Sequence, residues 1–239
     1  MGTRRHGGGY VAPAHGSQAL AESLDFGRHR KVPGYSGYVA RRARVPLVSA
    51  AGTSFTVAAG AACVDFAYTG GFADRAETVL APADFARWAA EAGLIADAFA
   101  SEISDADLAA AVELRETLWS SLNRVCDGGY PSDHECRVLN RLAAKPDLVP
   151  ALRIGVHGSM SVDDGGPITG SQLLSALARD AIALFAGPYA RRIKRCAADD
   201  CALLFVDTSR PGARRWCAMS RCGNRDKART RRRTHVQRE

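Results

Sequence analysis

The sequence predicts a mainly α-helical fold with a few short strands, followed by a small C-terminal module made of a β-hairpin and a helix. Four segments between residues 82 and 187 carry apolar side chains at helical spacing. Four of the seven cysteines fall between Cys196 and Cys222, and the residues after them are basic and lack proline. With 239 residues, 46% of them apolar, the chain can bury one full core, and its composition excludes a disordered or collagen-like protein.

Charge divides the chain into three parts. Residues 1–50 carry a net charge of +6, residues 51–190 carry −9, and residues 191–239 carry +10. We therefore predict a basic, flexible extension over residues 1–50, a mostly helical domain over 51–187 and a C-terminal module over 188–239. An acidic body with a basic tail is typical of a protein that docks on a polyanion, although a solvated tail has the same composition.

The first part of the body is predicted from residue types and helix-end signals. β-branched and aromatic side chains between Phe55 and Tyr68 predict one or two short strands. Pro82 suits the first turn of a short amphipathic helix that ends at Gly93. A capping-box pattern, Ser104 followed three residues later by an aspartate, starts a longer helix that runs to a Gly-Gly pair.

Two further helices and one strand complete the predicted body. Ser132 and Glu135 form a second capping-box pattern, and Pro146 stops the helix that they start. Alternating apolar residues over 152–156 predict a half-buried strand, and the apolar spacing over 171–185 predicts the last helix of the body.

The clustered cysteines predict a metal site. Cys196 and Cys201 are separated by four residues, as are Cys217 and Cys222, and 15 residues lie between the two pairs. Two short loops of this kind can supply the four thiolates of a tetrahedral Zn²⁺ site. Two disulfides or an iron–sulfur cluster would use the same residues, and His235 could replace one thiolate.

The segment around these cysteines predicts a treble-clef-like zinc module. Residues 203–206 read as a strand, 207–212 as a turn and 214–216 as a returning strand, so we predict a hairpin between the two cysteine pairs. A helix follows Cys222. About fifty residues with few large apolar side chains cannot fold on core burial alone, so the metal is expected to supply much of the folding free energy.

Arginines of that helix recur at a spacing that places them on one face. Arg221, Arg225, Arg229 and Arg232 fall at offsets of 0, 4, 8 and 11 residues, which at about 100° per residue form one basic stripe. Such a stripe can contact phosphates and base edges in the major groove of DNA. A solvated basic face is the alternative, and basic helices of this composition also bind RNA.

These residues resemble two known families. The segments 196–201, 204–209, 214–219 and 222–227, the last of which begins Cys-Gly-Asn-Arg, are similar to the CGNR zinc finger. Upstream, Cys63-Val64-Asp65-Phe66, the run from Thr78 to Asp84 and the segment leading to Gly93-Leu94 resemble the ABATE domain of bacterial stress-induced transcription regulators. The resemblance covers residues 55–230. It implies a mostly helical N-terminal domain and a zinc-dependent DNA-binding C-terminus; an asparagine usual after the Asp-Phe pair is absent here.

The sequence thus predicts a zinc-dependent DNA-binding transcription regulator whose acidic body senses a small-molecule signal or contacts a transcription protein. A zinc-stabilised protein-interaction module and an RNA-binding protein are the alternatives. Four thiolates close the zinc coordination sphere, so no enzyme is expected. No signal peptide or membrane span is recognisable, which predicts a cytoplasmic protein. The predicted contacts to double-stranded DNA are Arg221, Asn224, Arg225, Lys227, Arg229 and Arg232.

Overall fold

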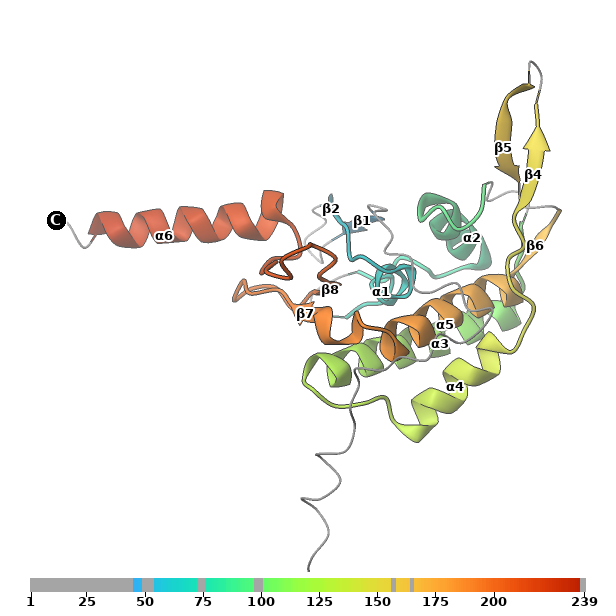
Figure 1. The fold of residues 1–239 in the computed structure, drawn as a ribbon, viewed down its shortest axis with the longest axis horizontal. Coiled ribbons are helices and arrows are strands. Elements are labelled where there is room, and N and C mark those ends of the chain that lie inside the picture. The colour runs from blue at the N-terminus through green and yellow to red at the C-terminus, as the bar shows by residue number, and fades with distance from the viewer. Residues whose placement is uncertain are drawn as a thin grey trace, which may run out of the picture. The chain divides into compact units, whose positions relative to one another are not determined.

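The computed structural model describes residues 45–48, 54–72, 76–96, 101–155, 158–163 and 166–236, so most of the predicted basic extension lies outside the described residues. Figure 1 shows the mainly helical fold with its short strands. In chain order the elements are β1 (Val45–Val48), β2 (Ser54–Val57), α1 (Ala62–Ala67), α2 (Pro82–Glu91), β3 (Ser101–Glu102), α3 (Asp105–Cys126), α4 (Asp133–Ala143), β4 (Ala151–Ile154), β5 (Met160–Asp163), β6 (Ile168–Thr169), α5 (Gly170–Ala186), the 3-10 turn η3 (Ala190–Arg192), β7 (Ile193–Arg195), β8 (Leu204–Val206), the π-helical turn η4 (Met219–Gly223) and α6 (Asn224–Val236).

The mainly α-helical class is confirmed, and so are the predicted helix starts. Helix α2 begins at Pro82. At the start of α3, the Ser104 hydroxyl accepts a hydrogen bond from the Asp107 N–H, and the Asp107 carboxylate accepts one from the Ser104 N–H. The same reciprocal pair, Ser132 with Glu135, caps α4. Each box satisfies backbone donors that a helix N-terminus leaves unpaired.

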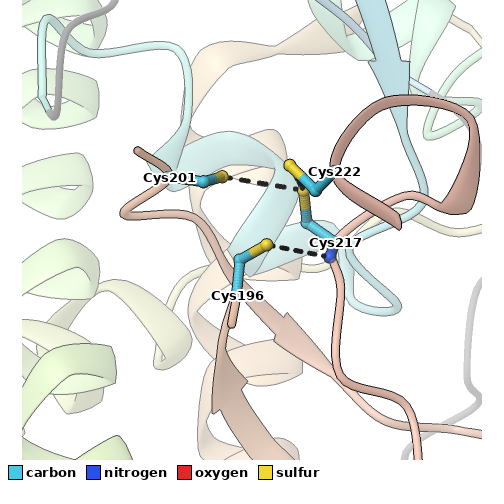
Figure 2. A group of neighbouring side chains, drawn as sticks. All are labelled: Cys196, Cys201, Cys217 and Cys222. Carbon is cyan, nitrogen blue, oxygen red and sulfur yellow. Dashed lines mark hydrogen bonds between the residues drawn. The ribbon is translucent and has the colours of Figure 1, made fainter. Parts of the chain in front are cut away.

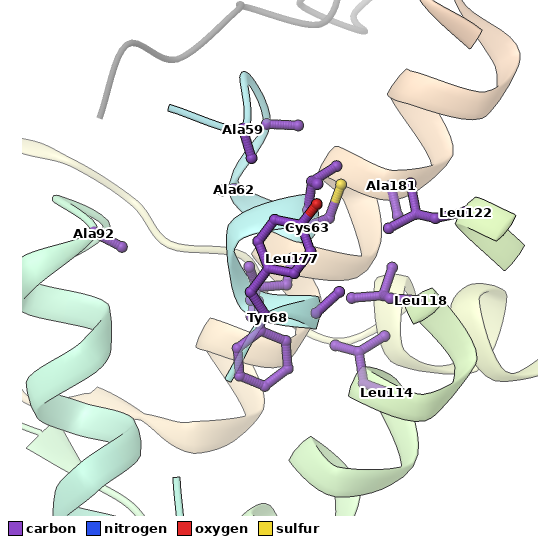
Figure 3. Packing of buried hydrophobic residues seen from close by; sticks show 14 of the residues in the cluster. Ala59, Ala62, Cys63, Tyr68, Ala92, Leu114, Leu118, Leu122, Leu177 and Ala181 are labelled. Atoms are coloured by element: carbon purple, nitrogen blue, oxygen red, sulfur yellow. The ribbon is translucent and has the colours of Figure 1, made fainter. Parts of the chain in front are cut away.

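The core of the body lies where helices α3 and α5 pack side by side with α1 against both (Figure 1). Leucines at helical spacing form the buried face of α3, and the buried face of α5, which contacts it, consists mainly of leucines and alanines. Figure 3 shows this packing, and the buried side chains at its centre are Cys63, Tyr68, Leu114, Leu118, Leu122, Leu177 and Ala181.

One predicted strand is a helix. Strand β2 pairs with β1 in antiparallel register, but residues 62–67 form the short helix α1, all of it buried. The β-branched and aromatic residues suggested extended structure, yet the alanines favour helix and tertiary packing decides the outcome. The Asp180 carboxylate accepts a hydrogen bond from the Cys63 N–H, so a residue 117 positions away satisfies a donor at the start of α1.

The strand predicted over residues 152–156 exists as β4, but it is not half-buried. Leu152 and Ile154 are each 71% exposed. Strand β4 pairs with β5 in a register that sets Ile154 opposite Met160, which is 73% exposed. The alternation predicted the strand correctly, whereas the expectation that its apolar face packs on the body is wrong. None of the helices in the described part of the chain is long and apolar enough to cross a membrane.

Candidate metal centre

Four cysteine side chains converge at one point of the C-terminal module (Figure 2). Their Sγ atoms all lie within 4.8 Å of one another. The Sγ of Cys217 is 3.8 Å from that of Cys201 and 3.6 Å from that of Cys222. A Zn–S bond of about 2.3 Å places tetrahedral sulfurs about 3.8 Å apart. The donor set therefore fits one zinc ion held by Cys196, Cys201, Cys217 and Cys222.

The alternatives that the spacing left open fit less well. A disulfide joins its sulfurs at about 2.05 Å, whereas the cysteine sulfurs here lie 3.6 and 3.8 Å apart and none of the seven cysteines forms a disulfide. An iron–sulfur cluster places several atoms between its cysteines and would hold them farther apart than a single ion does. The side chain of His235 lies outside the described residues.

A β-hairpin supplies the first pair of ligands. Strand β7 pairs antiparallel with β8, and Cys196 and Cys201 lie in the loop between them. The Cys196 N–H donates to the Leu203 carbonyl at 2.8 Å, which closes the loop. The hairpin and the helix of the module are confirmed, but the predicted partner strand, residues 214–216, is wrong.

Asp207 explains why residues after β8 do not return as a strand. Its carboxylate is fully buried and accepts hydrogen bonds from the N–H groups of Ser209 and Arg214 and from the Lys194 ammonium. These bonds fold residues 207–214 into a closed turn. Burial raises the pKa of Asp207, but the hydrogen bonds from Lys194, Ser209 and Arg214 outweigh it, so the pKa is lowered.

The second pair of ligands lies at the turn that precedes α6. Cys217 comes just before η4 and Cys222 lies within it, and the Cys222 N–H donates to the Ala218 carbonyl at 3.0 Å. The Cys217 N–H donates to the Cys196 Sγ at 3.4 Å, so backbone from the second pair contacts a ligand of the first. This turn is π-helical, which changes the direction of Arg221 relative to α6.

Hydrogen bonds among the sulfurs shift their pKa values in opposite directions. The pKa of Cys196 is lowered because the thiols of Cys201 and Cys217 donate to its thiolate. The pKa of Cys201 is raised to about 12, mainly through the same bond to Cys196, and that of Cys217 is also raised. Zinc binds only thiolates, so its binding displaces the protons that these sulfurs share.

The metal centre and the helical body pack on each other through strand β8. Strand β8 is entirely buried, and the Val206 N–H donates to the Ala59 carbonyl at 2.7 Å. The Tyr68 hydroxyl donates to the Leu204 carbonyl. Gly60 has a φ of +92°, and a Cβ atom on it would lie 2.9 Å from the Val206 carbonyl oxygen. The backbone at residues 59–60 therefore fits closely against β8.

Three of the predicted nucleic-acid contacts are engaged within the protein. The Arg221 guanidinium lies over the Phe55 ring, 3.6 Å from its centroid. Arg225 donates to the Asp200 carboxylate at 2.8 Å, and Arg229 donates to the same carboxylate at 3.2 Å. Sequence reasoning missed this acidic partner; the adjacent pair Asp199 and Asp200 in the first cysteine loop was the available signal.

The other three predicted contacts lie on the surface of α6. The Asn224 side chain donates to the Ser220 carbonyl at 3.5 Å and is exposed. Lys227 and Arg232 are exposed, and among the described residues neither has an ion-pair partner. The regular stripe predicted from the sequence thus lacks Arg221, which lies in the π-helical turn.

The fold and the site define a helical protein that carries a four-cysteine zinc finger at its C-terminal end. The model of the ABATE family, described as "Putative stress-induced transcription regulator", matches residues 60–188. The CGNR zinc finger model matches residues 192–235. The protein belongs to the ABATE family and carries a CGNR zinc finger, as its motifs predicted. Neither family is an enzyme family. No curated protein matches the chain.

Proposed function

We propose that the protein is a zinc-dependent, DNA-binding transcription regulator, in which α6 docks on duplex DNA and the acidic helical body senses a signal or contacts a transcription protein. One observation carries the proposal. Helix α6 begins two residues after the ligand Cys222 and presents the exposed cations Lys227 and Arg232. A metal-anchored helix with free cations is suited to bind phosphates.

The distribution of charge supports binding through this helix. Residues 51–190 carry 18 acidic and nine basic side chains, whereas residues 191–239 carry five acidic and 15 basic ones. The phosphate backbone would repel the first segment and attract the second. Arg225, Arg229 and Arg232 lie within about 60° of arc on α6, so a phosphate at Arg232 would be close to the arginines that Asp200 engages.

The test measures DNA binding by the zinc-loaded full chain as a function of salt. Replacing Lys227 and Arg232 together by glutamine should weaken binding of a fluorescent DNA duplex. It should also reduce the slope of log affinity against log salt by about 0.9 for each lost phosphate contact. Arg137→Gln is the matched control, because Arg137 is an exposed cation on α4. It should leave affinity and slope unchanged.

The alternatives have their own outcomes in the same experiment. A duplex RNA of matched sequence, bound more tightly than the DNA, would contradict the DNA assignment and favour RNA as the target. Absence of salt-dependent binding to either nucleic acid would contradict the proposal as a whole and favour a protein partner for the basic face of α6.

A further inference from the structure

We propose that Arg225 is a positioning residue of the zinc centre, because its guanidinium bridges the Cys222 sulfur and the Asp200 carboxylate. One terminal nitrogen, Nη2, lies 3.3 Å from the Cys222 Sγ. The other, Nη1, lies 2.8 Å from the Asp200 Oδ2. The planar guanidinium is suited to this task, since its donors point in fixed directions toward two separate acceptors.

The bridge connects the two halves of the metal site. Asp200 immediately precedes the ligand Cys201 in the loop of the β7–β8 hairpin, whereas Arg225 lies in the first turn of α6, three residues after Cys222. Arg229 also joins the helix to this loop, but among the described residues Arg225 is the one that contacts both Asp200 and a ligand sulfur. A residue that contacts both fixes the Cys222 sulfur relative to the first cysteine pair.

Charge at the centre explains why a cation would be placed there. Four thiolates on one Zn²⁺ leave a formal charge of −2, and Cys196, Cys217 and Cys222 are buried. A guanidinium donating to a ligand sulfur compensates part of that charge and reduces its basicity. Arg225 and Asp200 are 38% and 41% exposed, so their ion pair is screened, and the effect should come mainly from the sulfur contact.

Arg229 provides a matched comparison within the same helix. Its guanidinium donates to the same Asp200 carboxylate at 3.2 Å and approaches Asp199 at 4.0 Å. It has no hydrogen bond to a ligand sulfur within the described part of the chain. Loss of Arg229 therefore removes a similar charge and ion pair but leaves the zinc ligands untouched.

The experiment compares zinc release from the full-length variants Arg225→Ala, Arg229→Ala and Asp200→Asn into an excess of a chromogenic chelator. Removal of groups that hydrogen-bond metal ligands typically changes metal affinity by about 10–100-fold. We expect Arg225→Ala to release zinc on the order of 10-fold faster than wild type. Arg229→Ala should behave as wild type, and Asp200→Asn should be intermediate because it removes the group that orients Arg225.

Cobalt substitution gives a readout that a general loss of stability would not produce. In the Co²⁺-loaded protein, the sulfur-to-cobalt charge-transfer band should move to lower energy in Arg225→Ala, since a thiolate without its hydrogen bond gives up charge more easily. The band should stay in place in Arg229→Ala. Arg225→Lys keeps a cation and should restore part of both the release rate and the band position.

Equal release rates and superimposable cobalt spectra for Arg225→Ala and Arg229→Ala would overturn the proposal. A role for Arg225 in phosphate binding alone would change DNA affinity and leave both zinc readouts unchanged. If Arg225→Ala does not fold, Asp200→Asn and Arg225→Lys decide the question: zinc release no faster than in Arg229→Ala from both of them would likewise overturn it.

Discussion

Arg214 joins the zinc module to the helical body, and Arg214→Met should destabilise the whole protein. Its guanidinium donates to the carbonyl of Ala58 in the body and to those of Trp216 and Cys217 in the module. It also lies over the Phe205 ring, 4.3 Å from the centroid. Methionine keeps the apolar stem of the side chain and removes the donors and the charge.

The magnitude follows from the groups left without partners. Three half-buried carbonyl oxygens lose a donor, and each acceptor left unsatisfied costs at most about 1–3 kcal/mol. The contact with Phe205 adds about 0.5–2 kcal/mol. The Arg214 guanidinium is partly desolvated, which lowers its pKa, and removing this desolvated charge offsets some of the loss. We expect a net destabilisation of about 3–5 kcal/mol and a fall in Tm of roughly 6–20 °C.

Thermal unfolding followed by circular dichroism at a fixed zinc concentration measures this effect. Arg215→Met is the matched control, because the neighbouring Arg215 is exposed and lies 4.9 Å from the Trp216 ring centroid. Loss of that contact should cost about 1 kcal/mol or less. If Arg214→Met lowers the Tm no more than Arg215→Met does, the contacts of Arg214 do not hold the two parts together.

Three further predictions concern other parts of the chain. Burial raises the pKa of Glu135, but hydrogen bonds from Ser120 and Ser132 lower it overall. Glu135→Ala should therefore lower the free energy of unfolding, measured in urea at pH 7, by about 1 kcal/mol. That difference should shrink as the pH falls below about 4, toward the lowered folded-state pKa, and a constant difference would contradict the assignment. Gly60→Ala should lower the free energy of unfolding by more than about 2 kcal/mol, because residue 60 has a positive φ and the added Cβ would clash with β8. Gly128 has a φ of +85° but open space around it, so Gly128→Ala should lower the free energy of unfolding by less. Zinc removal should speed hydrogen exchange of the β8 amides and leave those of α3 protected. Unchanged exchange in β8 would show that its stability does not depend on the metal.

Local patterns predicted the parts of the fold that local interactions determine. The capping boxes of α3 and α4 are completed within four residues, so the sequence alone places both helix starts. The cysteine spacing likewise places four sulfurs around one ion, because each pair lies in one short loop or turn. The box formed by Thr169 and Gln172 at α5 follows the same rule.

Pairing and packing between distant segments could not be predicted in this way. The sequence predicted residues 214–216 as the partner of β8, and the pairing with β7 instead depends on the turn that Asp207 closes with Lys194 and Arg214. Helix α1 forms where residue types suggested strands, because its six residues are buried among helices from later in the chain. The exposed apolar face of β4 shows the same limit, since alternation indicates a strand but not what packs on it.

The predicted arginine stripe is wrong at Arg221, because the helix geometry there is not regular. Arg225 and Arg229 contact Asp200, a partner that lies far away in the sequence. A helical wheel assumes regular α-helix from Arg221 onward, but the π-helical turn directs Arg221 toward Phe55. Arg225 lies 25 residues after its partner Asp200, and the two meet where the hairpin loop and the start of α6 bring the four cysteines together. Both features depend on the folded metal centre rather than on helix periodicity.

The hydrogen bonds between the body and β8 determine how a structural change in the body would reach the basic helix. The carbonyls of Ala58 and Ala59 accept hydrogen bonds from the Arg214 guanidinium and the Val206 N–H, respectively. The hydroxyl of Tyr68, which directly follows α1, donates to the Leu204 carbonyl. A ligand or partner that displaced this short segment would have to break those bonds or move β8 with it. Because β8 follows the first cysteine pair directly, its movement would alter the support of the zinc ligands and hence the position of α6. The body and the finger are therefore connected through residues 58–68, and a displacement of this segment would be transmitted directly to the support of the zinc ligands.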